Sequence, residues 1–161
     1  MKAILIDPVA RSVTEVEYEG GLDSLYRLLD CQRVDALHLN GNIFEDGWNS
    51  VFIDDEALLD EENAPRHYFE IETERGWSPP VGSKGLVVGG NHEGKDIATA
   101  LTVEEIKTRV KFTERRFRGF RELPMQTIDH PVFGKILQVG VTADIPLVDG
   151  VNEEDDEEPK P

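Results

Sequence analysis

The stretch Gly85-Leu86-Val87-Val88-Gly89 is the clearest central strand of this chain. A short apolar run bounded by residues that favour turns is typical of a buried strand. Further strands are expected on both sides of it along the sequence. Those that precede it cover residues 2–6, 13–18, 34–40, 50–54 and 67–72, and one that follows it covers residues 135–141. The first two are expected to form a hairpin, because Asp7-Pro8 ends the first strand shortly before the second begins.

Two amphipathic helices are expected between these strands. The first covers residues 22–30, and its apolar face consists of Leu22, Leu25, Leu28 and Leu29. The second covers residues 103–111 and begins with a capping box formed by Thr102 and Glu105. Its buried face consists of Val103, Ile106 and Val110. Both helices are expected to pack in the same domain as the strands.

The order of these elements predicts an α+β fold with a mostly antiparallel sheet and two packed helices. Strands and helices do not alternate regularly, so a parallel sheet built of βαβ units is not expected. Residues 1–112 are predicted to form the α+β core of a single domain, and residues 113–148 an Arg/Phe-rich extension with a further strand. Residues 149–161 are predicted to be a disordered acidic tail, since six adjacent acids, 153–158, repel one another.

Composition limits the cellular location of the protein and the kind of partner that it can bind. The 161 residues carry a formal net charge of −16, which disfavours general coating of nucleic acid. No segment approaches the run of about 20 apolar residues that a membrane helix needs, so no membrane partner is expected. The start of the chain, residues 1–7, is too short and too soon charged for a signal peptide. A cytoplasmic protein is therefore expected, and the single cysteine, Cys31, allows no internal disulfide.

The segment Gly89–Lys95 fits the phosphate-binding pattern G-x-x-x-x-G-K, but its surroundings contradict that function. The pattern requires Ser or Thr at the next position, where this chain has Asp96. The predicted helix also begins several residues too late, after Thr102, to hold a phosphate at its N-terminus. An ordinary glycine-rich loop is the favoured interpretation.

A basic segment with interleaved phenylalanines covers residues 107–121. It holds seven Lys or Arg residues against one acid, Glu114. Arginine beside aromatic rings can bind phosphate and stack on bases, and it is also common at protein interfaces. Pairing with the acids of the same chain is the favoured interpretation, and a nucleotide or RNA is the alternative ligand. The candidate ligand-binding residues are Lys111, Arg115, Arg116, Arg118 and Arg121.

An acidic segment covers residues 45–62, with eight acids and neither Lys nor Arg. Such a segment can bind a divalent cation or imitate DNA phosphates, although most acidic segments are simply solvated. The EF-hand spacing is absent. The candidate partner-binding residues are Asp54, Asp55, Glu56, Asp60, Glu61 and Glu62.

The sequence offers no constellation typical of an active site. The four histidines lack the spacing of a zinc site, and no nucleophile elbow occurs. We therefore expect no catalytic residue, no metal and no cofactor, and the chain is not predicted to be an enzyme.

Several short segments resemble an uncharacterised domain family found in bacteriophage and plasmid genomes. The likeness covers roughly residues 1–112. It is carried by Met1–Pro8, Val13–Tyr18, Gly21–Leu29, Val51–Glu56, Gly85–Gly89 and Leu101–Ile106. The resemblance implies a small accessory protein of a phage or mobile element in the host cytoplasm, and it carries over no catalytic residue.

Three functions remain open at this point. The first is a non-catalytic protein that binds a host protein, with counter-defence as the analogy suggests. The second is a binder, or sponge, for a nucleotide or nucleic acid that uses the basic segment. The third is an acidic DNA mimic that inhibits a DNA-binding enzyme. A homo-oligomer is compatible with each of them.

Overall fold

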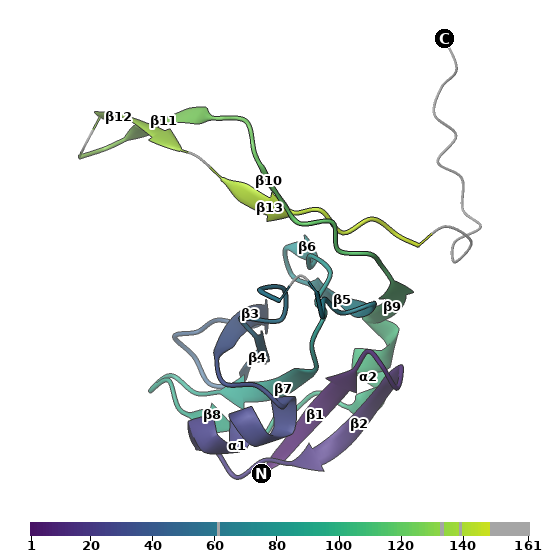
Figure 1. The fold of residues 1–161 in the computed structure, drawn as a ribbon. Coiled ribbons are helices and arrows are strands. Elements are labelled where there is room, and N and C mark those ends of the chain that lie inside the picture. The colour runs from purple at the N-terminus through teal and green to yellow at the C-terminus, as the bar shows by residue number, and fades with distance from the viewer. Residues whose placement is uncertain (61, 133, 139, 149–161) are drawn as a thin grey trace.

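The strand predicted at residues 85–89 lies in the middle of the main sheet. A computed structural model describes residues 1–60, 62–132, 134–138 and 140–148 (Figure 1). Its main sheet has the order β2-β1-β7-β4-β3, with β8 paired to β7, and every pairing in it is antiparallel. The strands are β1 (Lys2–Asp7), β2 (Ser12–Glu17), β3 (Val34–Asn40), β4 (Trp48–Asp54), β7 (Gly85–Gly90) and β8 (Asp96–Ile97). The predicted hairpin of the first two strands is confirmed.

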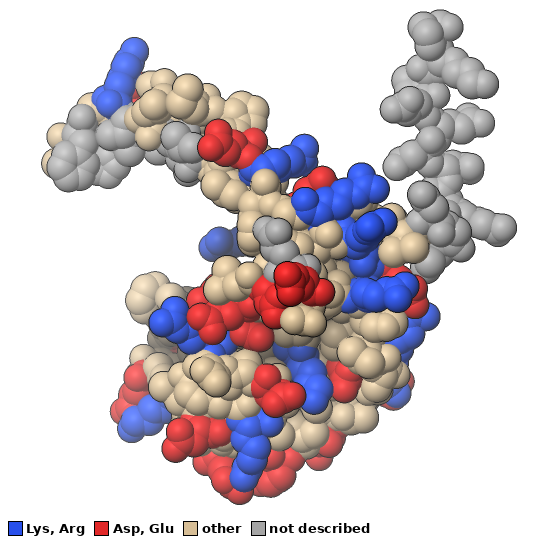
Figure 2. Space-filling model, viewed as in Figure 1, with Lys and Arg blue, Asp and Glu red and all other residues tan. Residues whose placement is uncertain are grey.

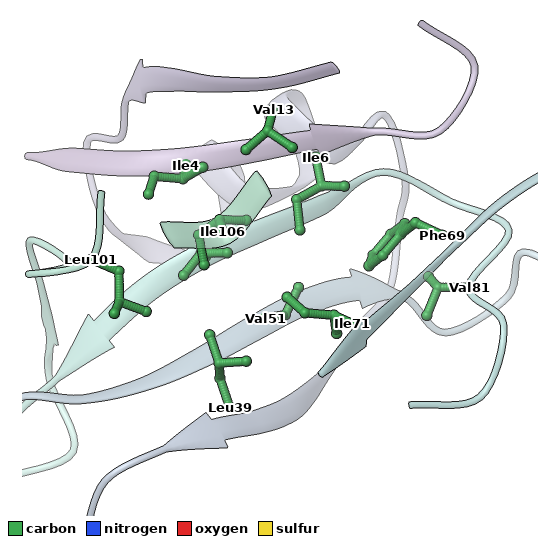
Figure 3. Packing of buried hydrophobic residues seen from close by; sticks show 11 residues of the cluster. Ile4, Ile6, Val13, Leu39, Val51, Phe69, Ile71, Val81, Leu101 and Ile106 are labelled. Atoms are coloured by element: carbon green, nitrogen blue, oxygen red, sulfur yellow. The ribbon is translucent and has the colours of Figure 1, made fainter. Parts of the chain in front are cut away.

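The main sheet is the middle layer of the body, and successive side chains of β7 point to its two faces. All six residues of β7 are buried. Val87 joins a core on one face that also contains Ile4, Ile6 and Phe69 (Figure 3). Leu86 and Val88 join a second core on the opposite face. A continuous apolar run is required here, because a strand covered on both faces has no position for a solvated side chain.

A helix and a second sheet cover the two faces. On one side lies α1 (Gly21–Leu29), whose Leu25 and Leu29 are buried with Leu86 and Val88. On the other side lie a three-stranded sheet of order β6-β5-β9 and the short helix α2. These elements are β5 (His67–Thr73), β6 (Gly76–Trp77), α2 (Val103–Thr108) and β9 (Val110–Glu114). The two helices thus contribute to different cores.

The first helix forms where expected, but its buried face differs from the predicted one. Leu25 and Leu29 are buried, whereas Leu22 is 56% exposed. Ser24 is buried in its place, and its hydroxyl accepts a hydrogen bond from the backbone of Glu19. The buried face of the helix therefore contains Ser24, Leu25 and Leu29, while Leu22 at its start stays exposed.

The second helix begins as predicted and ends earlier. The capping box is confirmed: the Thr102 hydroxyl accepts from the Glu105 amide, and the Glu105 carboxylate accepts from the Thr102 amide. The helix stops at Thr108, and residues predicted to be helical enter β9. There Val110 pairs with Ile71, so its backbone hydrogen bonds go to β5 instead of a further helical turn. Within the described residues, no helix has the length and apolar character needed to cross a membrane.

The extension contains more strands than the sequence predicted. The strand expected over 135–141 is two strands, β12 (Gly134–Gln138) and β13 (Val141–Ala143). They pair with β11 (Gln126–His130) and β10 (Phe120–Glu122), which lie in a segment for which no strand was predicted. We call residues 115–148 the arm, because they leave the body as an extended two-stranded ribbon (Figure 1). The predicted acidic tail, residues 149–161, lies outside the described residues.

Replacing Gly85 by alanine is expected to destabilise the protein by about 1–3 kcal/mol. A Cβ at this position would lie 2.7 Å from Cζ of Phe69 and 3.0 Å from Cγ1 of Val51. Both side chains are fully buried and cannot move away into solvent. Urea denaturation of Gly85→Ala, Phe69→Leu and the double variant measures the effect. We expect the double variant to lose less stability than the sum of the two single variants, and strict additivity would contradict the proposed contact.

Candidate functional site

Backbone pairing fixes the base of the arm to the body. His67 of β5 lies opposite Glu114 of β9, and the next amide, Arg115, donates to the carbonyl of Arg66 at 2.9 Å. The returning strand of the arm is held there too, because Leu147 bridges Arg115 and the Val148 amide donates to the carbonyl of Glu114 at 3.2 Å. Both ends of the arm therefore meet the same edge of the smaller sheet.

The side chain of Arg115 anchors this junction. Its guanidinium donates to Glu70 Oε2 at 2.9 Å, to the Ile145 carbonyl at 3.1 Å and to Thr113 Oγ1 at 3.0 Å. The Arg115 and Glu70 side chains are only 16% and 20% exposed. This pair is the pairing with the chain's own acids that the sequence analysis favoured. Its partial burial makes it a structural contact, whereas exposed ion pairs contribute little.

The other four candidate basic residues of the predicted ligand site are exposed. The Lys111 ammonium lies 3.8 Å from the centroid of the Trp77 ring, which is a cation–π contact. The side chains of Arg116, Arg118 and Arg121 have no hydrogen bond or ion pair with any residue that the structure describes. Figure 2 shows Lys and Arg side chains gathered where the arm leaves the body. Three of the five candidates are thus available to a ligand or partner.

A pocket of about 450 Å³ lies at the base of the arm, and we call it the arginine pocket. Of the predicted residues it contains Arg115 and Arg116, whereas Arg118 and Arg121 do not line it. Arg66, which the sequence analysis did not identify, joins them because the pairing of β5 with β9 places it beside Arg115. The full lining is Glu62, Ala64, Pro65, Arg66, Arg115, Arg116, Phe117 and Val148.

A buried tyrosine lies beside this junction. Tyr68 is fully buried, and its hydroxyl has no hydrogen-bond partner within the described part of the chain. Burial raises the pKa of this phenol, and the nearby positive charge of Arg115 acts in the opposite direction. Buried hydroxyl groups are usually hydrogen-bonded, so the Tyr68 phenol is an exception among the described residues.

The acidic candidates mainly stabilise their own loop. Asp54 accepts a hydrogen bond from the Glu56 amide at 2.9 Å, and the Glu56 carboxylate lies 3.6 Å from the Arg33 guanidinium. Asp60 accepts from the Glu62 amide and from both the backbone and side chain of Asn63. The Asn63 hydrogen bonds lower the pKa of the Asp60 carboxyl. Glu61 lies outside the described residues.

A second pocket brings the acidic and the Arg/Phe-rich segments together. We call it the apolar pocket, and its volume is about 350 Å³. Asp54 and Asp55 line it from the acidic segment, and Phe120 lines it from the arm. Phe120 also makes an edge-to-face contact with Phe117, with ring centroids 5.2 Å apart. The apolar residues that line this pocket are Leu37, Ile53, Ala57, Leu58, Leu59, Pro79, Pro80, Val81 and Phe120. The sequence analysis did not predict this pocket.

The glycine-rich segment after β7 is an ordinary turn, as favoured from its sequence. The chain turns at Asn91–Gly94 and continues into β8 rather than into a helix. The Asn91 side chain accepts hydrogen bonds from the Glu93 and Lys95 amides and so closes the turn. In the part of the chain that the structure describes, no group of three or more His, Cys, Asp or Glu residues is placed to hold a metal ion.

Comparison with known proteins adds no assignment to this geometry: no family model, curated protein or solved structure matches the chain.

Arg115→Ala is expected to destabilise the protein by about 1.5–3 kcal/mol, because it leaves the partly buried Glu70 carboxylate without its charged donor. Arg116→Ala is the matched control. The neighbouring Arg116 is exposed, so its replacement should change stability by no more than about 0.5 kcal/mol. Urea denaturation midpoints measure both effects. Equal losses in the two variants would contradict a structural role specific to Arg115.

Proposed function

We propose that this protein acts without catalysis, by binding a partner protein through the arm. The observation that carries the proposal is the exposure of large apolar side chains along the ribbon. Beyond Ile106, none of the residues whose burial the structure describes is buried. The exposed apolar residues of the arm include Phe120 (51%), Leu123 (43%), Met125 (67%), Leu137 (62%) and Val141 (62%). Several large apolar side chains exposed within one short segment are typical of an interaction site.

The energetics of the ribbon support this proposal. A two-stranded ribbon with no third layer is only marginally stable in water. Fully burying a leucine or methionine side chain contributes about 1.5–3 kcal/mol, so covering Leu123, Met125 and Leu137 would stabilise both the ribbon and a complex. Each described pair of arm strands forms a two-stranded sheet, so a partner can also add a strand along an outer edge.

Charge indicates the kind of surface that fits the arm. Residues 115–148 contain five Lys or Arg and three Asp or Glu, so their formal net charge is +2. Residues 1–114 contain 11 Lys or Arg and 23 Asp or Glu, so their formal net charge is −12. A suitable partner presents an apolar surface with an acidic rim. The positively charged arm attracts such a rim, and the negatively charged body repels it. In the setting implied by the phage and plasmid resemblance, the partner is a host cytoplasmic protein and the activity is counter-defence.

The test uses a double variant of the arm, Leu123→Ser with Leu137→Ser. Its matched control is Leu22→Ser with Phe44→Ser, which removes two exposed apolar side chains from the body. Tagged protein captures its partner from a bacterial lysate, and the purified pair is then titrated by calorimetry. We expect wild type and the body variant to bind the same protein in fixed stoichiometry, and the arm variant to lose at least tenfold in affinity. A partner retained equally by the arm variant would refute the proposal.

A second candidate function is the binding of a nucleotide or RNA in the arginine pocket. It is supported by two exposed guanidinium groups, Arg66 and Arg116, beside the half-buried Phe117 ring. Arginine with an aromatic ring suits phosphate and base together. The acidic DNA-mimic hypothesis stays a prediction, and Asp54 and Asp60 are already engaged in their own turns.

A further inference from the structure

We propose that the arginine pocket is an intramolecular binding site for the acidic C-terminal segment of the same chain, residues 149–161. The occupant is thus a carboxylate-rich peptide tethered to the pocket. This inference goes beyond the proposed function, because it concerns the base of the arm rather than the exposed leucines along the ribbon. It assigns the arginine pocket a resident occupant, which a nucleic acid or another polyanion would have to displace.

The course of the chain leads to the pocket. Val148 is part of the pocket lining, and its amide donates to the Glu114 carbonyl at 3.2 Å. Leu147, one residue earlier, bridges Arg115. The described part of the chain therefore ends at the pocket wall, at Val148. The acidic run begins at Glu153, five residues beyond Val148. A fully extended span of that length reaches about 18 Å, so the carboxylates can return to the arginines without strain.

The charges on the two sides are complementary. Residues 149–161 hold seven acids against one lysine, hence −6. The pocket presents Arg66 and Arg116, whose guanidinium groups have no hydrogen bond or ion pair with the described residues. The Arg115 guanidinium also lines the pocket, but the Glu70 carboxylate at 2.9 Å balances its charge, so the attraction comes from Arg66 and Arg116. The acidic run thus begins close to two exposed guanidinium groups that have no partner among the described residues.

Tethering allows this segment to occupy a pocket whose affinity for a free anion is low. Glu62 also lines the pocket, and its carboxylate weakens the attraction for any free anion. Exposed ion pairs are individually weak and are screened by salt. A short tether, however, gives an effective concentration in the millimolar range, so several weak pairs suffice. The resulting contact is reversible, depends on ionic strength and covers the base of the arm.

The test measures where the C-terminal segment lies in the full-length protein. A nitroxide is attached at Lys160→Cys in a chain that also carries Cys31→Ser, and paramagnetic relaxation of amide signals is recorded. We expect strong relaxation at Arg66, Arg116 and Phe117 at low salt. It should fall at least threefold at about 0.5 M salt, where the Debye length is only a few ångströms. It should also fall when the six acids are neutralised: Glu153→Gln, Glu154→Gln, Asp155→Asn, Asp156→Asn, Glu157→Gln and Glu158→Gln.

A pair of matched arginine variants separates this pocket from a general attraction to the basic arm. Arg66→Gln with Arg116→Gln should abolish the salt-sensitive relaxation at Phe117. Arg118→Gln with Arg121→Gln removes the same charge further along the arm and should leave it intact, because these residues do not line the pocket. The proposal fails if both variants lose the effect equally, or if relaxation centres on Arg118 and Arg121.

A second readout uses a fluorescent single-stranded RNA as the probe. If the acidic segment fills the pocket, neutralising its six acids should raise the affinity for this probe about tenfold, and Arg66→Gln with Arg116→Gln should remove the gain. An affinity that is unchanged by neutralisation would contradict the proposal and favour a pocket open to nucleic acid. Neither result affects partner capture by Leu123 and Leu137, so the two proposals fail independently.

Discussion

The structure depends on the burial of β7 on both faces. This strand lies between β1 and β4, and its side chains enter two separate cores. Glycine is favoured at its first residue, because a Cβ at Gly85 would lie 2.7 Å from the Phe69 ring and 3.0 Å from a Val51 methyl group. A single strand thus holds α1 against one face and β5 with α2 against the other. If β7 were displaced, neither covering layer would keep its apolar surface buried.

The same core places the candidate site, through the alternation of side chains in β5. Phe69 points into the core and is fully buried, and it fixes the register of the strand against β9. The next residue, Glu70, points away from the core and receives the Arg115 guanidinium. The arm therefore begins at a defined point, although it has no core of its own. A body with two cores thus carries an arm whose large apolar side chains are exposed.

Local signals in the sequence predicted the elements whose stability is local. The apolar run at residues 85–89 and the capping box of Thr102 and Glu105 each specify an element through neighbouring residues alone, and both are confirmed. The end of α2 was not predictable in this way. Val110 continues the helical spacing of Val103 and Ile106, yet its pairing with Ile71 of β5 draws it into a strand. Ile71 is distant in sequence, and helical periodicity describes only neighbouring residues, so it gives no indication of this pairing.

The site was predictable only in part, for the same physical reason. The concentration of arginine in residues 107–121 identified the region, but not which guanidinium groups are engaged. Arg115 and Arg116 are adjacent, and only the strand geometry turns one toward Glu70 and the other toward solvent. Arg66 belongs to the pocket through the register of β5 and β9, which places it next to Arg115. A prediction that paired these two strands from sequence would have found it.

Amide hydrogen exchange on the monomer, at a concentration too low for self-association, tests most directly whether the arm lacks a core. The account predicts that amides of β7 exchange only through global unfolding, at a rate set by the full free energy of unfolding. Amides in the β10–β13 and β11–β12 pairs should exchange at least a hundredfold faster, through local opening of the ribbon. Protection in the arm equal to that of β7 would contradict the account, because it would require a covering layer that is part of the monomer itself.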